Sequence, residues 1–353
     1  MALTLTSVAD PALAAFDAVI DVRSPAEFAE DQLPGAISLP VLDDEERARV
    51  GTIYKQQSPF LARKVGAALV ARNAARHLEG PLAGMGGGWR PLVYCWRGGQ
   101  RSGSFATILS QVGWRAETLA GGYRAWRTLV VDEVQARPVR SPVVVLDGNT
   151  GTAKTEVLGL LAARGHQVID LEGLARHRGS LFGAMPGGQP GQRAFEGAVA
   201  VALSRLDPSR PLVIEAESAK VGDLLVPKQL WAAMRAAPRV AIEAPLDVRA
   251  AYLARAYGDV TADAGRLAGV IGQLRPFHAR EVIEVWLGMA AAGAFVALAR
   301  ELMEHHYDPR YGRQRDRAEP GRRLAVSAEN LSEAALPGLA ERVAQAVAGI
   351  AGR

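Results

Sequence analysis

The thiol of Cys95 is the side chain in this sequence whose surroundings point most directly to chemistry. It is the only cysteine among 353 residues, and it follows an apolar run, Leu92-Val93-Tyr94, that predicts a buried strand. A glycine-rich loop, residues 97–103, comes next and carries Arg97 and Arg101. The backbone N–H groups of such a loop, a following helix N-terminus and Arg101 would lower the thiol pKa and favour a nucleophilic thiolate. The alternative is a small residue buried at a strand end, which is common for lone cysteines.

A second loop, residues 148–155, has the composition of a phosphate-binding loop. Its sequence, Gly-Asn-Thr-Gly-Thr-Ala-Lys-Thr, directly follows the apolar run Val143–Leu146, so we expect it between a strand and a helix. Backbone N–H groups there would surround a diphosphate, Lys154 would neutralise it, and the Thr155 hydroxyl could hold Mg²⁺. The residues expected to bind a diphosphate or a nucleotide are Gly148, Asn149, Thr150, Gly151, Thr152, Lys154 and Thr155. An unrelated glycine-rich turn is the alternative.

Ala153 departs from the phosphate-loop pattern. It stands where the motif has its second glycine. A methyl group at this position is tolerated if the backbone dihedrals there are helical. The sequence therefore leaves open how Ala153 changes ligand binding by this loop.

Two more segments are candidate parts of a site because they follow predicted strands. Glu215 and Glu217 end the run Leu212–Ser218, and the alternation of a strand places both on one side, where they could approach a metal or a water near the phosphates. Surface salt bridges are the alternative for these two acids. The second segment follows the predicted strand at 168–171, where substrate loops occur; its candidates are Arg176, His177 and Arg178.

The histidines of the C-terminal half do not predict a zinc site. His305 and His306 are adjacent, and neighbouring side chains on a helix point in different directions. His278 stands between Phe277 and two arginines, and we expect it on the surface of a helix.

Composition and charge indicate a globular cytoplasmic enzyme. Hydrophobic residues make up 49% and charged residues 22% of the chain, and the net charge is +4. A single cysteine excludes an internal disulfide and fits a reducing compartment. The N-terminal residues lack the pattern of a signal peptide, and no apolar run is long enough to cross a bilayer. We expect no membrane partner.

Arginine residues are concentrated near the C-terminus. Between 310 and 323 there are six arginines against Asp316 and Glu319, a local +4 that equals the net charge of the whole chain. A phosphate-rich partner and a solvated charged loop both explain this segment. The six residues are Arg310, Arg313, Arg315, Arg317, Arg322 and Arg323.

Strands that alternate with helices must position these loops. Short apolar runs at 18–22, 92–94 and 116–119 alternate with helical segments, which predicts a parallel α/β sheet with its chemistry at the strand C-terminal ends. Ser24 is expected to cap a helix opened by Pro25. The polar segment 132–142 contains two prolines and predicts a domain boundary, so we expect domains at 1–135 and 140–353. The second domain has predicted strands at 143–146, 168–171, 212–218 and 239–243, then an alanine-rich helical region at 247–302.

Four segments of the first domain resemble, in order, the signatures of the rhodanese family. They are Asp21-Val22-Arg23 with Glu27-Phe28, Leu33–Ile37, the Cys95 loop and Gly121–Trp126. The resemblance implies a parallel-sheet domain whose loop cysteine carries a persulfide or an equivalent chalcogen adduct. Five residues separate Cys95 from Arg101, one more than in the usual sulfurtransferase loop. This is the spacing of cysteine phosphatases, and it implies a wider pocket suited to phosphate or a chalcogen-substituted phosphate.

The pairing of a rhodanese-like domain with a phosphate loop makes the chain similar to the tRNA 2-selenouridine synthase family. Four further segments carry the resemblance: Tyr54–Gln57, Tyr94–Gly99, Asp170–Ser180 and His306–Tyr311. The resemblance implies a P-loop NTPase-like α/β domain with a helical C-terminal part after the rhodanese-like domain. It also implies that sulfur is replaced by selenium on 2-thiouridine at the tRNA wobble position, through an S-geranylated nucleoside.

The same resemblance implies co-substrates and roles. Cys95, Arg97 and Arg101 are expected to seat selenophosphate, and the phosphate loop is a candidate for geranyl diphosphate, with a nucleotide left open. Contacts to tRNA phosphates are expected from Arg176 to Arg178 and from the six arginines at 310–323. A selenophosphate-producing enzyme is a candidate partner.

Two other classes of function are alternatives. One is a cysteine phosphatase, an arsenate-reductase-like enzyme or a sulfurtransferase fused to a small-molecule P-loop kinase. The spacing from Cys95 to Arg101 and the phosphate loop support it, and turnover of an aryl phosphate with ATP hydrolysis, indifferent to tRNA, would favour it. The other is a regulatory module in which the first domain only binds a partner; the intact Cys95 disfavours this class.

Overall fold

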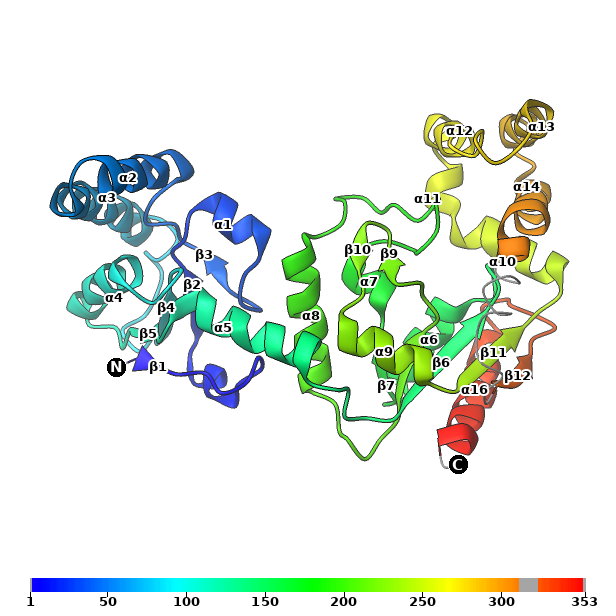
Figure 1. The fold of residues 1–353 in the computed structure, drawn as a ribbon, viewed down its shortest axis with the longest axis horizontal. Helices are drawn as coiled ribbons and strands as arrows, with labels where there is room; N and C mark the ends of the chain where they lie inside the picture. Colours follow the sequence, from blue (N-terminus) through cyan, green and yellow to red (C-terminus); the bar gives the residue numbers. More distant parts are fainter. Residues whose placement is uncertain (1, 311–322, 352–353) are drawn as a thin grey trace. The chain divides into compact units, whose positions relative to one another are not determined.

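The computed structural model describes residues 2–310 and 323–351, and the chain divides into two compact units. Unit 1 comprises Met1–Arg137 and Pro190–Arg205, and unit 2 comprises Pro138–Gln189 and Leu206–Arg353. Helix α8 (Gln192–Ser204) therefore belongs to unit 1, although a boundary near 135–140 assigns it to the second domain. Figure 1 shows α8 beside α5 (Gly122–Val131). The contact is close, because a Cβ on Gly197 would lie 2.9 Å from the ring of Trp126.

Unit 1 contains a five-stranded parallel sheet in the order β1-β5-β4-β2-β3. The strands are β1 (Ala2–Leu3), β2 (Ala18–Asp21), β3 (Ile37–Ser38), β4 (Pro91–Tyr94) and β5 (Glu117–Leu119). Strand β4 is central, and all four of its residues are buried, as expected of a strand covered on both faces. The parallel sheet predicted from the alternating pattern is confirmed.

Helices lie between these strands and after the last of them. They are η1 (Pro11–Ala15), α1 (Pro25–Glu30), α2 (Asp44–Gln56), α3 (Pro59–Glu79), α4 (Gln100–Val112), α5 and η2 (Asp132–Ala136). Helix α1 begins at Pro25 with Ser24 as its N-cap residue, as predicted.

Helices α2 and α3 form a hairpin, and Figure 1 shows them side by side. A capping box begins α2: the Glu46 N–H donates to Asp43 Oδ1 at 2.7 Å, and the Asp43 N–H donates to Glu46 Oε2 at 3.1 Å. Ser58 ends the turn between the helices, and its hydroxyl accepts from the Phe60 N–H at 3.2 Å. The Asn73 side chain ties α3 to α2 by donating to Glu46 Oε2 at 2.7 Å.

Unit 2 contains a second five-stranded parallel sheet, in the order β12-β11-β6-β8-β7. Its strands are β6 (Val143–Gly148), β7 (Gln167–Ile169), β8 (Leu212–Glu215), β11 (Arg239–Glu243) and β12 (Arg323–Ser327), and β9 (Lys220–Val221) pairs with β10 (Leu224–Leu225) in a separate antiparallel ribbon. Strand β6 is central and carries the phosphate loop. The edge strand β12 was not predicted, because it lies beyond the arginine-rich segment in a region interpreted as helical.

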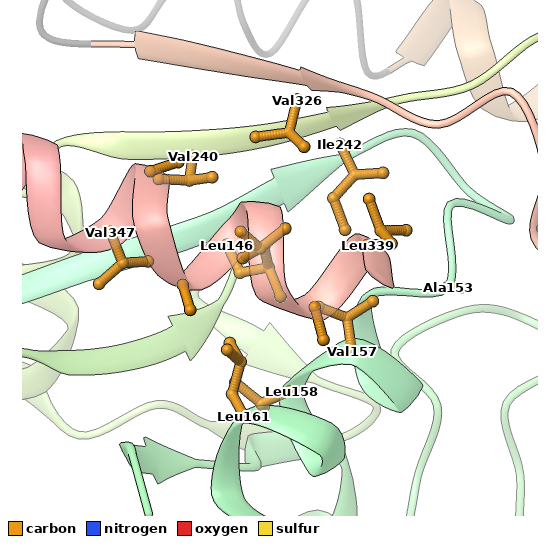
Figure 2. Close-up of a cluster of buried hydrophobic side chains, with 14 of the residues drawn as sticks. Leu146, Ala153, Val157, Leu158, Leu161, Val240, Ile242, Val326, Leu339 and Val347 are labelled. Atoms are coloured by element: carbon orange, nitrogen blue, oxygen red, sulfur yellow. The ribbon is translucent and has the colours of Figure 1, made fainter. Parts of the chain in front are cut away.

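Helices α6 (Lys154–Ala163) and α16 (Leu336–Ala351) share a core with the strands of unit 2. Figure 2 shows Leu339 and Val347 of α16 in one cluster with Leu146 and Val240 from the sheet and Val157 from α6. All five side chains are at most 1% exposed. This core fixes the strand and the helix between which the phosphate loop runs.

The remaining helices of unit 2 are α7 (Leu171–Ala175), α9 (Lys228–Ala236), α10 (Leu246–Ala256), α11 (Gly258–Thr261), α12 (Ala264–Gly272), α13 (Arg280–Ala291), α14 (Phe295–Leu302) and η3 (Met303–Tyr307). The segment from α11 to α14 has its own core, which includes Val260, Leu267, Ile283 and Trp286. This confirms the helical region predicted at 247–302. Among the described residues, no helix combines the length and the apolar character that crossing a membrane requires.

Candidate active site

Cys95 opens the cysteine loop (residues 95–101), directly after β4. Its side chain is 4% exposed, and its Sγ accepts a hydrogen bond from the Ser102 hydroxyl at 3.2 Å. Burial raises the pKa of the thiol, but hydrogen bonds from Ser102, the charge of Arg101 and the Gly99 N–H lower it, so the pKa lies below its ordinary value. The expectation of a lowered thiol pKa agrees with this geometry. The role of Ser102 as a donor to Cys95 was not predicted from the sequence.

The start of α5 holds the cysteine loop in shape. The N–H groups of Tyr123 and Arg124 donate to the carbonyl oxygens of Cys95 and Trp96 at 2.9 and 3.0 Å. Gly122 has a φ of +59°, and a Cβ there would lie 2.2 Å from the Cys95 carbonyl oxygen. Only glycine fits this position. The Gly121–Trp126 signature therefore acts by shaping the loop that presents the thiol.

A buried carboxylate orients Arg101. Its Nη1 donates to Oε2 of Glu27 in α1 at 2.8 Å, and Arg47 binds the same oxygen at 2.9 Å. Burial raises the pKa of Glu27, but the hydrogen bond and charge of Arg101 outweigh this and lower it to about 2. Arg97, by contrast, is exposed and has no ion pair among the residues that the structure describes. Of the two predicted arginines, Arg101 alone is held next to the thiol.

A buried ionic network packs beside the cysteine loop. Arg23 is 1% exposed and binds Asp21 at 2.7 Å, and its guanidinium lies 4.0 Å from the centroid of the Tyr123 ring. The Tyr123 hydroxyl donates to Asp31 Oδ2 at 2.8 Å. Fully partnered buried networks of this kind fix one arrangement of the groups around them. The Asp21-Val22-Arg23 signature is thus part of the frame of the site.

The phosphate loop joins β6 to α6, as predicted. Nζ of Lys154 donates to the carbonyl oxygens of Gly148 at 2.9 Å and Asn149 at 3.3 Å. The Thr152 hydroxyl donates to the same Asn149 carbonyl at 2.9 Å, and Gly148 approaches this hydroxyl so closely that a Cβ would lie 2.5 Å from it. The loop therefore curls around its own lysine, and the side chain of Thr152 is engaged in that turn.

Ala153 does not meet the condition of helical dihedrals under which its methyl group would be tolerated without strain. It has a φ of +60° and a ψ of 27°, the left-handed conformation. This conformation costs a non-glycine residue about 1–2 kcal/mol. The methyl group is 3% exposed and belongs to the core cluster of unit 2, and its burial offsets roughly 0.8 kcal/mol of that cost. The loop therefore keeps the backbone of a glycine motif in spite of the alanine.

Carboxylates gather around the lysine end of the phosphate loop. The Thr155 hydroxyl lies 3.1 Å from both Glu172 Oε2 and Glu215 Oε2. Burial and the neighbouring Glu217 raise the pKa of Glu172 to about 8, and burial and the neighbouring Glu215 raise that of Glu217 to about 7. Burial also raises the pKa of Glu215, whose Oε1 has no hydrogen-bond partner among the described residues. Lys154 alone does not balance the charge that the three carboxylates would carry if all were ionised, and their raised pKa values favour the protonated forms. Glu172 was missed in the sequence because only its distant partners give it a role.

The side chains of the three candidates after β7 do not all line the pocket at the phosphate loop. Arg178 lines the pocket at the phosphate loop, pairs with Asp259 at 2.9 Å, and has its guanidinium 4.9 Å from the Tyr257 ring centroid. Arg176 is exposed, and its φ is +49°. Burial lowers the pKa of His177, whose Nδ1 has no partner within the described part of the chain. Of the three side chains, only that of Arg178 is among those that line this pocket.

A pocket of about 280 Å³ lies at the phosphate loop, and an apolar pocket adjoins it. Lys154, Thr155 and Glu217 are among the polar lining of the first. The residues that line both pockets are Thr150, Ser180, Leu253 and Tyr257. Beyond these, the apolar pocket is lined mainly by hydrocarbon and aromatic side chains, among them Phe182, Val260, Leu267, Phe295, Leu298 and Met303.

Arg249 connects the phosphate loop to Asp308. Its side chain is 5% exposed, donates to the Thr150 carbonyl at 3.1 Å and binds Asp308 at 2.7 Å. Asp308 follows η3, whose Met303 lines the apolar pocket. One ion pair therefore links the backbone of the loop to the pocket wall.

His278 is not on a helix surface, and this expectation is wrong. It lies between α12 and α13, and its Nε2 is 2.8 Å from Nδ1 of the buried His306. Nε2 of His306 lies 2.6 Å from Arg310 Nη1. Because arginine can only donate, this nitrogen of His306 accepts and Nδ1 carries the proton. Burial lowers the pKa of His306 to about 4, which fits a neutral ring.

The described members of the arginine-rich segment both have intramolecular partners. Arg310 binds His306, and its guanidinium lies 4.6 Å from the Phe277 ring centroid. Arg323 in β12 pairs with Glu243 at 2.8 Å. The other four predicted contacts, Arg313, Arg315, Arg317 and Arg322, lie outside the described residues.

Comparison with known proteins assigns both units to families. Residues 7–129 match the rhodanese-like domain, and residues 141–274 match the tRNA 2-selenouridine synthase AAA domain. A tRNA 2-selenouridine synthase of Alcanivorax borkumensis is 33% identical over 325 residues, which cover 83% of this chain and 88% of the relative. That of Chromohalobacter salexigens is 40% identical over 250 residues, 68% of this chain and 65% of the relative. The chain belongs to the tRNA 2-selenouridine synthase family.

Membership of the tRNA 2-selenouridine synthase family confirms three predictions: the family itself, an enzyme, and a rhodanese-like domain followed by a P-loop-like domain. A solved rhodanese-related protein from Thermoplasma volcanium is 19% identical, with a TM-score of 0.22 over 35% of this chain and 88% of that chain. The fold assignment here rests on the two parallel sheets and the family matches.

Proposed function

We propose that this member of the tRNA 2-selenouridine synthase family replaces sulfur by selenium on 2-thiouridine at the wobble position of tRNA, in two steps. Geranyl diphosphate first alkylates the sulfur, and selenium from selenophosphate then displaces the alkylated sulfur. The observation that carries the proposal is the paired pocket of unit 2, in which a phosphate loop opens onto an apolar cavity. Such a pair suits a diphosphate that bears a hydrocarbon chain.

The apolar pocket supports geranyl diphosphate over a nucleotide. A ribose and a base need hydrogen-bond partners, whereas Phe182, Leu267 and Leu298 offer none from their side chains. Burial of ten carbon atoms contributes on the order of 5 kcal/mol or more before the cost of ordering the chain. A nucleotide at the same loop would gain none of this.

The first step is a substitution at carbon 1 of the geranyl chain. The thiocarbonyl sulfur forms a bond to this carbon, the carbon–oxygen bond breaks, and the diphosphate leaves with the electron pair, while the N3 proton of the base is lost to solvent. Lys154 and the N–H groups of the phosphate loop stabilise the charge that develops on the leaving group. The product is a thioether-like sulfur, which leaves more readily than the sulfur of a C=S group.

The second step takes place at the cysteine loop. Selenophosphate is an anion, and Arg101 and Arg97 balance its charge beside Cys95, whose thiolate relays the selenium by attacking phosphorus. The phosphorus–selenium bond breaks, and selenide leaves with the electron pair and attacks carbon 2 of the base. A carbon–selenium bond forms as geranyl thiolate leaves with its electron pair and takes a proton, and water hydrolyses the phosphorus–sulfur bond to release phosphate and restore Cys95. The lowered pKa of Cys95 supports a thiolate in this role.

Mg²⁺ fits the phosphate-loop pocket. The described residues contain no group of three or more His, Cys, Asp or Glu side chains that could hold a metal by themselves. The Thr155 hydroxyl and the unpaired Oε1 of Glu215 are oxygen ligands of the kind Mg²⁺ prefers, and a ligand phosphate would add to them. The raised pKa values of the carboxylates indicate that positive charge is lacking near them, and the ion would supply it.

The proposed reaction belongs in the cytoplasm, together with its tRNA and an enzyme that produces selenophosphate. The donor is a reactive anion, and its chemistry requires a source within reach of the cysteine loop. We therefore propose that an enzyme that produces selenophosphate is a partner of this chain.

The Lys154→Ala variant tests the first step. Incubated with 2-thiouridine tRNA and geranyl diphosphate, it should form S-geranylated nucleoside at least 100-fold more slowly than the unaltered protein, because the loop loses its charge on the leaving group. Mass spectrometry of digested nucleosides measures the product. Lys228→Ala, on the exposed start of α9, is the matched control and should keep the wild-type rate. Displacement of geranyl diphosphate by equimolar ATP would argue for a nucleotide site instead.

The Cys95→Ser variant tests the second step separately. It should geranylate tRNA at the wild-type rate but lose selenium transfer, because a serine hydroxyl is not ionised at neutral pH. The five-residue spacing to Arg101 favours a phosphatase as the second candidate. Turnover of an aryl phosphate by the wild type, lost in Cys95→Ser and indifferent to tRNA, would support that alternative.

A further inference from the structure

The α2–α3 hairpin contains a long stretch without acidic residues. From Arg47 to Leu78 there are seven Lys and Arg residues and no Asp or Glu, a charge of +7 against +4 for the whole chain. Five of the seven are exposed and have no hydrogen bond or ion pair with any other residue that the structure describes. They are Arg49, Lys55, Arg63, Lys64 and Arg72. Surface helices usually balance such charges with acids three or four residues away. Arg49 has Glu45 and Glu46 at these distances, but the other four cations have no acid within four residues in the sequence.

Aromatic side chains are exposed at the tip of the same hairpin. Tyr54 near the end of α2 is 57% exposed, and Phe60 at the start of α3 is 69% exposed. Leu61 beside them is 38% exposed. The rings flank the turn at 57–58, so they stand at the same end of the hairpin as Lys55. Aromatic rings in a basic, unpaired surface are typical of a binding site for unstacked nucleotide bases.

The exposed face of α3 continues this surface along the helix. Its cations Arg63, Lys64 and Arg72 lie on either side of exposed alanines at positions 67, 68 and 71. Lys64 and Arg72 are eight positions apart, which is roughly 12 Å along the helix axis. Because the side chains between the cations are small, a polyanionic backbone can approach the helix closely while it contacts the cations at both ends.

We propose that this hairpin surface, formed by Arg49, Tyr54, Lys55, Phe60, Arg63, Lys64 and Arg72, binds the tRNA substrate. The cations contact phosphates, and Tyr54 and Phe60 stack on unpaired bases of a tRNA loop. The inference rests on the proposed function, because it takes tRNA as the substrate. Charge complementarity selects a polyanion, and the rings at the tip select one that offers unstacked bases.

Removal of charge from α3 tests the phosphate contacts. In the full-length protein, the triple variant Arg63→Gln/Lys64→Gln/Arg72→Gln keeps good helix formers at exposed positions. We expect its Kd for a transcribed tRNA with uridine at the wobble position to rise roughly 10- to 100-fold at 100 mM KCl. The slope of log K against log salt should fall by about 2–3, because each phosphate contact contributes about 0.7–0.9. Circular dichroism checks that α3 is intact.

A triple variant elsewhere removes the same charge. Arg115→Gln/Lys228→Gln/Arg235→Gln changes exposed residues without partners in the described part of the chain and lowers the net charge equally. Its Kd should change less than about threefold. If the two triple variants bind tRNA equally well, the hairpin proposal is wrong while the proposed function stands. If the unaltered protein does not bind tRNA, the proposed function itself is wrong.

Removal of the rings tests the stacking contacts. Tyr54→Ala/Phe60→Ala should raise the Kd about tenfold or more and leave the salt slope at its wild-type value, because no phosphate contact is lost. The same variant should bind a fully paired RNA hairpin stem as the wild type does. An unchanged Kd for tRNA would overturn the stacking contacts. Wild-type binding to phosphatidylserine vesicles that the charge triple abolishes, with unchanged tRNA binding, would assign the surface to a membrane instead.

Discussion

The cysteine loop and the phosphate loop occupy equivalent places in two parallel sheets, yet their electrostatics are opposite. Each follows a central strand, β4 or β6, and leads into a helix. Around the cysteine loop, arginines lower the pKa of Glu27 to about 2, and the pKa of Cys95 also lies below its ordinary value. Around the phosphate loop, burial and mutual repulsion raise the pKa of Glu172 to about 8 and that of Glu217 to about 7.

The difference shows what each loop needs from its ligand. The cysteine loop has its cations in place, so an anion can bind without a metal. The phosphate loop faces an excess of carboxylates, so a diphosphate needs additional positive charge there. The two loops also differ in their need for glycine. At position 122 the surrounding backbone leaves no room for a side chain, so only glycine fits. Ala153, by contrast, keeps a glycine-like backbone with a methyl group buried in the core.

The largest expected effect comes from Gly122→Ala. Its Cβ would lie 2.2 Å from the Cys95 carbonyl oxygen and 2.5 Å from the Gly98 nitrogen, and both atoms belong to backbone that cannot rotate away. We expect a loss of about 3 kcal/mol or more in the free energy of unfolding, measured by chemical denaturation. Alkylation of Cys95, the only thiol in the chain, should also change in rate, because the loop that presents it must shift.

Gly113→Ala separates the clash from backbone strain. Gly113 has a φ of +110°, but a Cβ there would meet nothing within 4 Å. Its cost should be about 1 kcal/mol, with no change in the reactivity of Cys95. Equal losses in the two variants would mean that the contact between Gly122 and the cysteine loop is unimportant.

Glu27→Gln should produce the next largest effect, and only above acidic pH. A pKa lowered from 4.5 to about 2 corresponds to roughly 3 kcal/mol of stability. Because the folded pKa is below the unfolded one, this stability is present above pH 4.5 and is lost as the pH falls towards 2. The variant should therefore be less stable than the wild type at pH 7 and converge with it near pH 2. Glu79→Gln, an exposed acid at the end of α3, is the control and should change little at any pH.

The carboxylates of the phosphate loop should show the opposite pH dependence. The folded pKa values of Glu172 and Glu217 are above the unfolded value of 4.5, so their contribution is fully present below pH 4.5 and is lost as the pH rises through about 7 and 8. Between pH 6 and 8.5 the unfolding temperature should fall, and Glu172→Gln/Glu217→Gln should remove most of that fall. Mg²⁺ should stabilise the wild type more at pH 8.5 than at pH 6. A stabilisation by Mg²⁺ that persists in full in the double variant would rule out these carboxylates as the cause.

The chemistry-bearing loops could be predicted from the sequence because each is local. Cys95, Arg101, Lys154 and Thr155 stand next to strands and glycines in patterns short enough to recognise. Their partners are distant in the sequence: Glu27 reaches Arg101 across 74 positions, and Glu215 reaches Thr155 across 60. A rhodanese signature includes Glu27, and the segment Asp170–Ser180 includes Glu172. Neither pattern shows that Glu27 binds Arg101 or that Glu172 contacts Thr155, so these roles could not be predicted.

For the fold too, features with local patterns could be predicted, and features that depend on distant contacts could not. Strands with strong apolar runs were predicted, whereas β12 was missed because Arg323–Ser327 begins at the end of the arginine-rich segment. The placement of α8 with unit 1 depends on Gly197 allowing the Trp126 ring to approach, a contact between residues 71 positions apart. The dihedrals of Ala153 could not be predicted for a related reason, because the surrounding core, and not the preference of alanine, determines its backbone.

Ala153→Gly should have the smallest effect, and it sharpens the contrast with Gly122. The substitution relieves left-handed strain of about 1 kcal/mol, but it removes a methyl group that is 3% exposed, at roughly 0.8 kcal/mol, and adds freedom to the unfolded chain. These contributions nearly cancel, so the free energy of unfolding should change by less than about 1 kcal/mol. The rate of geranylation should remain within about threefold of wild type, because the loop already has the backbone of a glycine motif.

Ala162→Gly within α6, at ordinary helical dihedrals, should cost about 1 kcal/mol and so calibrates the comparison. A gain in stability of 2 kcal/mol or more in Ala153→Gly would mean that the alanine is strained well beyond what its buried methyl group offsets.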